Sequence, residues 1–195
     1  MTTTTDTLAD AFQRIQQIVR RTVDGASEAV LTFRADDEAN TVAWLVWHLT
    51  RVQDGHVSEL AGVDELWVDG GWHDRFGLPF DASATGYGQS SSEVAEVRGV
   101  SPDDLIGYHD AVCARTLDYV ATLGDEDFGR IVDTSWTPPV TLAARLVSVI
   151  SDDLQHAGQA SFVRGVAERA GARAVGRSRI RCQLRRRLCR VVSAM

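Results

Sequence analysis

Four segments of the chain repeat apolar residues at alternating steps of three and four positions, the spacing that places side chains on one face of an α-helix. These segments cover residues 7–23, 40–61, 102–123 and 141–165. Alternation of the kind that marks β-strands is scarce, and the sequence contains no internal repeat. The pattern therefore predicts an all-α protein built as a four-helix bundle of the antiparallel type.

Residues that favour helix ends lie at several of these boundaries. Asp6 and Asn40 are expected to cap the first and second helices, because their side chains accept hydrogen bonds from free backbone N–H groups. Ser101, followed by Pro102, is expected to begin the third helix. Gly62 is expected to end the second helix, since glycine readily adopts the left-handed conformation found there.

The connection between the second and third helices, residues 63–100, is long and rich in glycine, serine and aromatic residues. Its rings are Trp67, Trp72, Phe76, Phe80 and Tyr87. A long aromatic-rich loop in a compact domain usually forms a lid, a pocket wall or a small satellite cluster on the core. The pattern leaves two interpretations open, a cover over the end of the bundle and a wall of a substrate pocket.

The fourth segment carries polar residues in the middle of a helical stripe. The stripe consists of Arg145, Val149, Asp152, His156, Gln159 and Val163. Asp152 and His156 are one helical turn apart, with Cβ atoms roughly 6 Å from each other. A carboxylate and an imidazole at that separation can bind the same metal ion.

His48 lies within the most apolar run of the second segment. A lone histidine in such a run is usually a hydrogen-bonded core residue, but the aligned pair on another helix makes a third metal ligand the better interpretation. His56 lies roughly 12 Å further along the helix axis, which is too far to share the ion. His109 is expected to pack or to form a hydrogen bond. Arg51 and Asp54, three residues apart, are expected to form a local ion pair.

The composition is that of an ordinary globular domain, with 195 residues, 44% hydrophobic and 24% charged. No apolar run approaches the ~20 residues needed to span a bilayer. The N-terminus lacks the features of a secretory signal, so a cytoplasmic location without membrane contact is expected. Cys113, Cys182 and Cys189 form no recognisable disulfide framework, which fits a reducing compartment. Cys113 is expected to be a buried, inert thiol.

Charge is distributed unevenly along the chain. All 20 basic residues are arginine, and residues 164–195 contain 10 of them with one acid. Residues 1–163 therefore hold 10 basic and 26 acidic groups, a net charge of −16, which argues against nucleic-acid binding. The sequence predicts a bundle domain over residues 1–166 and an arginine-rich tail, residues 167–195, that packs poorly or is disordered. A basic amphipathic helix contacting an anionic surface and a shifted reading frame are the alternatives for the tail.

Four separated segments resemble one known family. They are NTVAWLVWHLTRVQD (40–54), GWHDRFGLPFD (71–81), TGYG (85–88) and DDLQHAGQ (152–159). In order and content they are similar to the DinB/YfiT-like superfamily, and most of all to its mycothiol-S-transferase-like branch, which is related to mycothiol-dependent maleylpyruvate isomerase. The resemblance covers about residues 6–166 and leaves the tail outside.

The resemblance implies a four-helix bundle that holds a divalent metal ion through one histidine of the second helix and an i, i+4 pair of the fourth. These positions are His48, Asp152 and His156 in this sequence. Many members have histidine at the position of Asp152, whereas the maleylpyruvate isomerase also has a carboxylate there. Zinc is the expected metal, with nickel, manganese and iron as alternatives.

The function expected from these residues and the resemblance is a metal-dependent thiol S-transferase with mycothiol as the thiol co-substrate. The metal would favour the thiolate form of the thiol, and an electrophilic substrate would lie under the aromatic loop. Asp153 and Gln159 are expected to support the ligands, and no further catalytic or cofactor-binding residue is identified. The alternatives are an isomerase or hydrolase that uses metal-bound water and a non-catalytic metal-binding bundle. A homodimer is compatible with the sequence.

Overall fold

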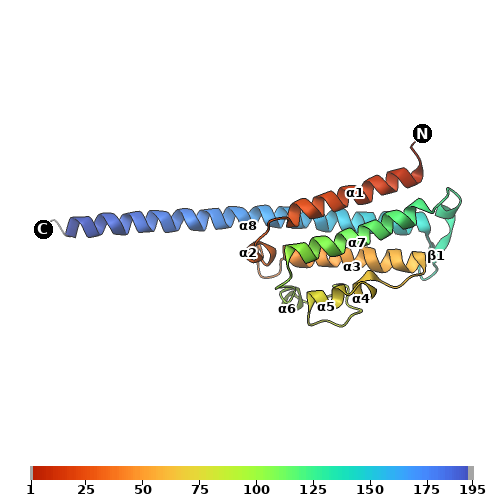
Figure 1. Ribbon diagram of the computed structural model, residues 1–195, viewed down its shortest axis with the longest axis horizontal. Coiled ribbons are helices and arrows are strands. Elements are labelled where there is room, and N and C mark those ends of the chain that lie inside the picture. The colour runs from red at the N-terminus through yellow and green to blue at the C-terminus, as the bar shows by residue number, and fades with distance from the viewer. Residues whose placement is uncertain (1, 193–195) are drawn as a thin grey trace.

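Four long helices form the body of the protein in the computed structural model, which describes the backbone of residues 2–192 and the side chains of residues 2–171. They are α1 (Thr4–Val23), α3 (Val42–Ala61), α7 (Pro102–Ala121) and α8 (Leu142–Val192). Helix α1 packs against α7 and α8, and α3 packs against the same two helices from the other side (Figure 1). The predicted all-α four-helix bundle is confirmed.

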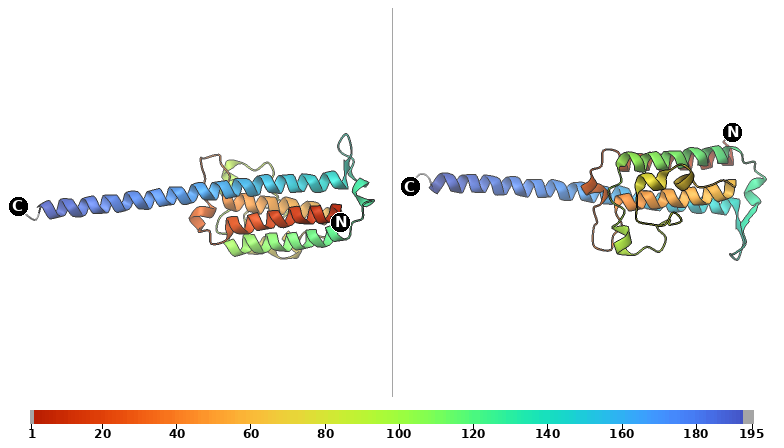
Figure 2. Two further views of the ribbon diagram at one scale, coloured as in Figure 1. Left: turned by 90° about the horizontal axis from the view of Figure 1, so that it is seen from above. Right: turned by 60° about the horizontal axis from the view of Figure 1, so that its bottom comes forward.

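The directions of the helices follow from the long connection between α3 and α7. Both of these helices run the same way, whereas α1 and α8 run in the opposite direction (Figure 1, Figure 2). The bundle therefore has two antiparallel contacts, α1 with α7 and α3 with α8, and two parallel ones. The long connection is needed because it returns the chain to the end of the bundle at which α3 began.

Short elements occupy the connections between the long helices. They are α2 (Glu28–Leu31), α4 (Leu66–Asp69), α5 (Trp72–Phe76), α6 (Ser91–Val94), the 3₁₀-helix η1 (Asp127–Gly129), β1 (Ile131–Asp133) and β2 (Val140–Thr141). The two strands pair in an antiparallel manner just before α8. Three of the short helices divide the predicted loop, so it is less irregular than the glycine and serine content indicated.

The helix caps are partly as predicted. Ser101 accepts a hydrogen bond from a backbone N–H of α7, and Gly62 adopts the left-handed conformation at the end of α3, which confirms both predictions. Thr41, not Asn40, caps α3, because its side chain accepts from a backbone N–H of the first turn. Thr3 caps α1, and Asp6 is the acid that completes a capping box three residues later.

The buried face of α8 is displaced by one position from the predicted stripe. Its buried residues up to Val163 are Leu142, Leu146, Val149, Asp153, Ala157, Ala160 and Val163. All but one are apolar, so this face suits the core better than the predicted stripe. Asp152 and His156 are half-buried at its border, next to α3.

Helix α8 does not end at Gly165 but continues to Val192, beyond the end of the bundle (Figure 1). Its last buried side chain in the described part of the chain is that of Ala167. The division into a bundle and a tail at residue 166 remains a prediction. Ile180, Leu184 and Leu188, the residues of the predicted amphipathic face, lie outside the described side chains.

The aromatic residues of the long connection divide into two groups. Trp67 and Phe76 are buried and contact the ring of Tyr108 on α7, at centroid distances of 5.3 and 5.8 Å. Tyr87 is 92% exposed and lines a cleft between the connection and the bundle. Part of the connection therefore packs against α7 as a satellite cluster, and Tyr87 lines a cleft; a substrate in that cleft stays a prediction.

Candidate metal centre

His48, Asp152 and His156 meet where α3 and α8 pack against each other. Each offers one ligand atom, and the three atoms lie within 4.8 Å of one another. The Nε2 atom of His156 is 3.5 Å from Oδ1 of Asp152, and the two imidazole rings are 4.8 Å apart between centroids. The fold thus brings His48 to the predicted pair on α8 from a position more than 100 residues earlier in the sequence.

The second ring nitrogen of each histidine already has a partner. Nδ1 of His48 lies 2.6 Å from the carbonyl oxygen of Thr85, and Nδ1 of His156 lies 3.1 Å from Oε1 of Gln159. A histidine that donates from Nδ1 has its Nε2 lone pair available for a metal ion. The contact of Gln159 agrees with the supporting role predicted for it.

One oxygen of the group has no partner in the protein. Oδ2 of Asp152 is buried and accepts no hydrogen bond from any described residue. A buried carboxylate oxygen without a donor is costly, and a bound cation would satisfy it. The donor set of two imidazoles and one carboxylate also matches sites that hold divalent ions with open positions. The residues therefore fit a metal ion.

The ring of His48 is held in place from both sides. Trp44, one turn earlier on α3, stacks on it with centroids 4.7 Å apart and planes at 15°. Gly86 approaches from the loop so closely that a Cβ atom there would lie 2.8 Å from Nδ1 of His48. Only glycine suits this position, because its φ is +94° as well.

The protonation equilibria of the three candidate ligands differ from one another. Burial lowers the pKa of His48, so its ring is neutral at neutral pH. Burial alone would raise the pKa of Asp152, but the contact with His156 outweighs it and the pKa is lowered. The same contact raises the pKa of His156. Asp152 and His48 thus favour the forms in which they can ligate, a charged carboxylate and a neutral imidazole, whereas His156 favours its protonated form more than a free imidazole does, and a metal ion would compete with that proton.

Arg51 and Asp54 have a larger role than the local ion pair predicted for them. Their closest charged atoms are 3.8 Å apart, but both side chains are buried and mainly hold the long connection against α3. Arg51 donates to Oε2 of Glu65 at 2.6 Å and to the carbonyl of Ala84 at 3.1 Å. Asp54 accepts from the backbone N–H groups of Leu66 and Trp67 and from the hydroxyl of Tyr108. The sequence signal for this buried role was the presence of two charged residues, Arg51 and Asp54, in an otherwise apolar part of the helix.

A cleft of about 660 Å³ opens beside the group, and two of its three members, His48 and Asp152, line it. It is lined by His48, Arg51, Val52, Gly55, His56, Glu59, Glu65, Thr85, Tyr87, Ser148, Val149 and Asp152. His56 is not a member of the candidate metal group, as predicted, yet it lines the same cleft. The spacing along the helix excluded His56 as a metal ligand, but nothing in the sequence indicated that His56 lines the cleft.

A buried acid next to the candidate metal group does not join it. Asp153 is fully buried, and neither of its oxygens has a hydrogen-bond partner among the described residues. Burial, and then the charge of Asp152, raise its pKa well above the usual value for an aspartate. The predicted support of the ligands by Asp153 is therefore not observed, because its side chain points to the core instead.

The histidine and cysteine of α7 are also buried away from the cleft. His109 lies 3.2 Å from the hydroxyl of Thr50, as expected for a packing residue with a hydrogen bond. Burial lowers its pKa to about 4. Burial raises the pKa of Cys113 to about 11, which agrees with an inert thiol.

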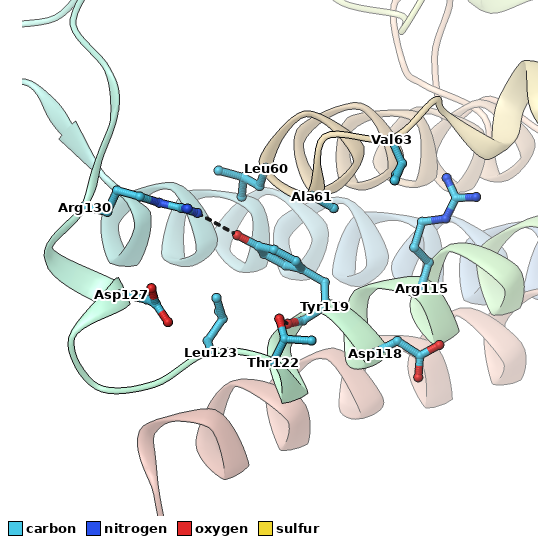
Figure 3. Close-up of a pocket in the computed structure, with 10 residues that line it drawn as sticks. All are labelled: Leu60, Ala61, Val63, Arg115, Asp118, Tyr119, Thr122, Leu123, Asp127 and Arg130. Atoms are coloured by element: carbon cyan, nitrogen blue, oxygen red, sulfur yellow. Dashed lines mark hydrogen bonds between the residues drawn. The ribbon is translucent and has the colours of Figure 1, made fainter.

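A second cleft, of about 610 Å³, lies between the C-terminal ends of α3 and α7 (Figure 3). Its polar side chains include Tyr119, whose hydroxyl accepts a hydrogen bond from Arg130 at 3.1 Å. None of the three candidate ligands lines it. The chemistry of this cleft gives no reason to place a reaction there, so the first cleft is the candidate functional site.

The chain is similar to a family of known proteins over most of its length. The family model described as mycothiol-S-transferase matches residues 7–168, which is most of the chain. The chain belongs to this family. The matched range includes all three candidate ligands and both sides of the cleft, and it ends close to the last buried residue of α8, Ala167.

A solved structure supports the same fold. A conserved protein from Enterococcus faecalis is similar with a TM-score of 0.79 and 29% sequence identity, and the match covers 84% of this chain and 96% of that one. None of the curated proteins compared matches this mycothiol-S-transferase family member. Within the part of the chain that the structure describes, no helix has the length and apolar character that a membrane crossing requires.

Proposed function

We propose that this protein is a divalent-metal-dependent S-transferase that joins mycothiol to an electrophilic small molecule. The observation that carries the proposal is the convergence of His48, Asp152 and His156, with ligand atoms within 4.8 Å, at the head of a cleft. Membership of the mycothiol-S-transferase family supports the choice of thiol.

The metal ion would be held by Nε2 of each histidine and by a carboxylate oxygen of Asp152. Zinc is the proposed ion, with nickel, manganese or iron as alternatives, because imidazole and carboxylate ligands are common to all four. When bound, the ion supplies a charge that stabilises the thiolate form of a thiol at neutral pH. Three protein ligands leave room for an exogenous one, whereas a structural zinc site is usually filled by the protein.

The residues around the group prepare the site for such a reaction. Thr85 and Gln159 fix the two imidazole rings through their Nδ1 atoms, so the rings need no rearrangement when a ligand arrives. Trp44 covers one face of His48 and excludes water from it. The cleft then holds the thiol and the electrophile together, so that the sulfur electron pair forms the new S–C bond while a leaving group departs with its own pair.

The proposal is tested with purified protein in metal-loaded and metal-free forms. Metal content is measured by elemental analysis, and mycothiol is mixed with several generic electrophiles. We expect conjugate formation only with the loaded form. His48→Ala is expected to keep the helical circular-dichroism spectrum but to lose the metal and the activity, while His73→Ala, outside the group, keeps both.

Two results would contradict the proposal. Loaded protein that turns over no thiol with several acceptors would favour a hydrolase, an isomerase or a non-catalytic bundle. Wild-type protein that binds no divalent ion would remove the basis of the proposal altogether.

A further inference from the structure

The end of the cleft away from the candidate metal centre is lined by polar side chains that form no hydrogen bond with another described residue. His56 and Glu59 lie on α3 and Ser148 lies on α8, and all three line the cleft, with the side chain of Glu59 71% exposed. Among the described residues, no hydrogen bond reaches either ring nitrogen of His56, and its nearest charged neighbour is Oε2 of Glu59 at 4.0 Å from Nδ1. We call these three residues the far wall. His48 is roughly 12 Å away from His56 along the helix axis.

The charge of the cleft is negative. Its acids are Glu59, Glu65 and Asp152, and its one arginine, Arg51, already donates to Glu65 at 2.6 Å. The bundle around it is acidic too, with a net charge of −16 over residues 1–163. A divalent ion at the candidate metal centre would offset this charge at the near end of the cleft, so the far end, where Glu59 lies, is the part that repels anionic ligands and accepts neutral or cationic ones.

The chemistry of the far wall suits hydroxyl groups. The carboxylate of Glu59 has two oxygens that can accept from a pair of neighbouring hydroxyls, and Ser148 can donate and accept. Burial, and then the charge of Arg145, lower the pKa of His56. Arg145 itself is paired with Asp133 at 2.7 Å. A neutral imidazole offers one donor and one acceptor.

We propose that the far wall selects the thiol co-substrate by its body, accepting a neutral, hydroxyl-rich thiol and rejecting thiols that carry carboxylates. This inference rests on the proposed function. Mycothiol has a neutral body of amino sugar and inositol, whereas glutathione has two carboxylates. Glu59 accounts for both the acceptance of one thiol and the rejection of the other. Its carboxylate accepts hydrogen bonds from hydroxyl groups, and at the same position it repels a carboxylate of the ligand.

The kinetic test compares Glu59→Gln and Glu59→Lys with wild type, each loaded with metal. The matched control is Glu38→Gln, an exposed acid that does not line the cleft. The thiols are mycothiol, glutathione and N-acetylcysteine methylamide, a small neutral thiol without the hydroxyl-rich body. We expect Glu59→Gln to raise the KM for mycothiol about tenfold while that for the small thiol stays unchanged. Glu59→Lys should raise kcat/KM for glutathione about tenfold, and less at high salt.

A binding test needs no turnover and no metal. The thiol-free glucosamine–inositol body is titrated into metal-free protein by calorimetry. We expect wild type and Glu38→Gln to bind it alike, and both Glu59→Gln and His56→Gln to bind it about tenfold more weakly. The helical circular-dichroism spectrum of each variant shows whether the fold is retained.

The outcomes separate this inference from the proposed function. If wild type transfers no thiol but binds the thiol-free body through Glu59, the proposed function fails and the far wall stands as a binding site. If thiol transfer occurs but Glu59→Gln affects all three thiols equally, or the thiol-free body does not bind, the inference is wrong and the proposed function survives.

Discussion

Single residues in this bundle differ widely in what burial does to their protonation, and the effect on His109 has a consequence for stability. Its ring is fully buried, accepts or donates one hydrogen bond with Thr50, and leaves Nε2 without a partner among the described residues. Burial lowers its pKa from 6.5 to about 4. The folded protein therefore takes up this proton less readily than the unfolded chain does.

The pH dependence of stability that results from His109 has a definite sign. Above pH 6.5 the ring is neutral in both states and contributes nothing, and as pH falls toward 4 the unfolded state gains the proton first. The free energy of unfolding should therefore fall by about 3 kcal/mol from His109 alone between pH 7 and pH 4. Urea unfolding of metal-free protein at both pH values measures the loss. His109→Gln should lose about 3 kcal/mol less than wild type over this range, whatever its stability at pH 7. An equal loss in both proteins would contradict the assignment.

At the scale of elements, the long connection between α3 and α7 reaches the candidate metal centre through its backbone rather than through its side chains. The carbonyl of Thr85 orients His48, and Gly86 allows that approach. Arg51 and Asp54 then fix the connection to α3. The geometry of the centre thus depends on the loop as much as on the two helices that carry the ligands.

Gly86→Ala should therefore weaken metal binding, because its Cβ would lie 2.8 Å from Nδ1 of His48 and displace the hydrogen bond to Thr85. Loss of such a supporting contact typically costs tenfold or more in metal affinity. Gly88→Ala is the matched control, since Gly88 also has a positive φ, +73°, but a Cβ atom at that position would meet nothing within 4 Å. It should lose about 1 kcal/mol of stability from backbone strain and keep the metal affinity. Equal metal affinities in a competition titration with a chelator would show that the loop contact is unimportant.

The same elements show what the sequence can and cannot predict. The helices and the group of His48, Asp152 and His156 were predictable, because helical periodicity, an i, i+4 pair and the family resemblance all depend on local sequence. The sequence did not show which of the adjacent acids, Asp152 or Asp153, faces the core, because rotating the helix by one residue position exchanges the two. The contact between the carbonyl oxygen of Thr85 and His48 could not be predicted either, because every residue has a backbone carbonyl and the sequence does not show which one lies near a given side chain.

For the whole molecule, the question is how much of α8 the bundle needs. Val163 and Ala167 are buried in the core. Arg164 donates to the backbone carbonyls of Arg21, Thr22 and Asp24 at the end of α1. The family match ends at residue 168, close to the same point. These contacts tie α8 to α1, and we predict that the bundle needs α8 only up to about residue 168.

A chain ending at Gly171 should therefore retain the fold, with a Tm within about 3 °C of the full-length value, and should retain the metal. A chain ending at Phe162 should lose about 3 kcal/mol or more, since it lacks the burial of Val163 and Ala167 and the three bonds of Arg164. Thermal unfolding of the three chains is compared at about 0.15 M salt, because the cut at Gly171 removes eight arginines and changes the net charge from −7 to −15. If the chain ending at Gly171 unfolds like the shorter one, residues 172–195 stabilise the bundle and the predicted division at residue 166 is wrong.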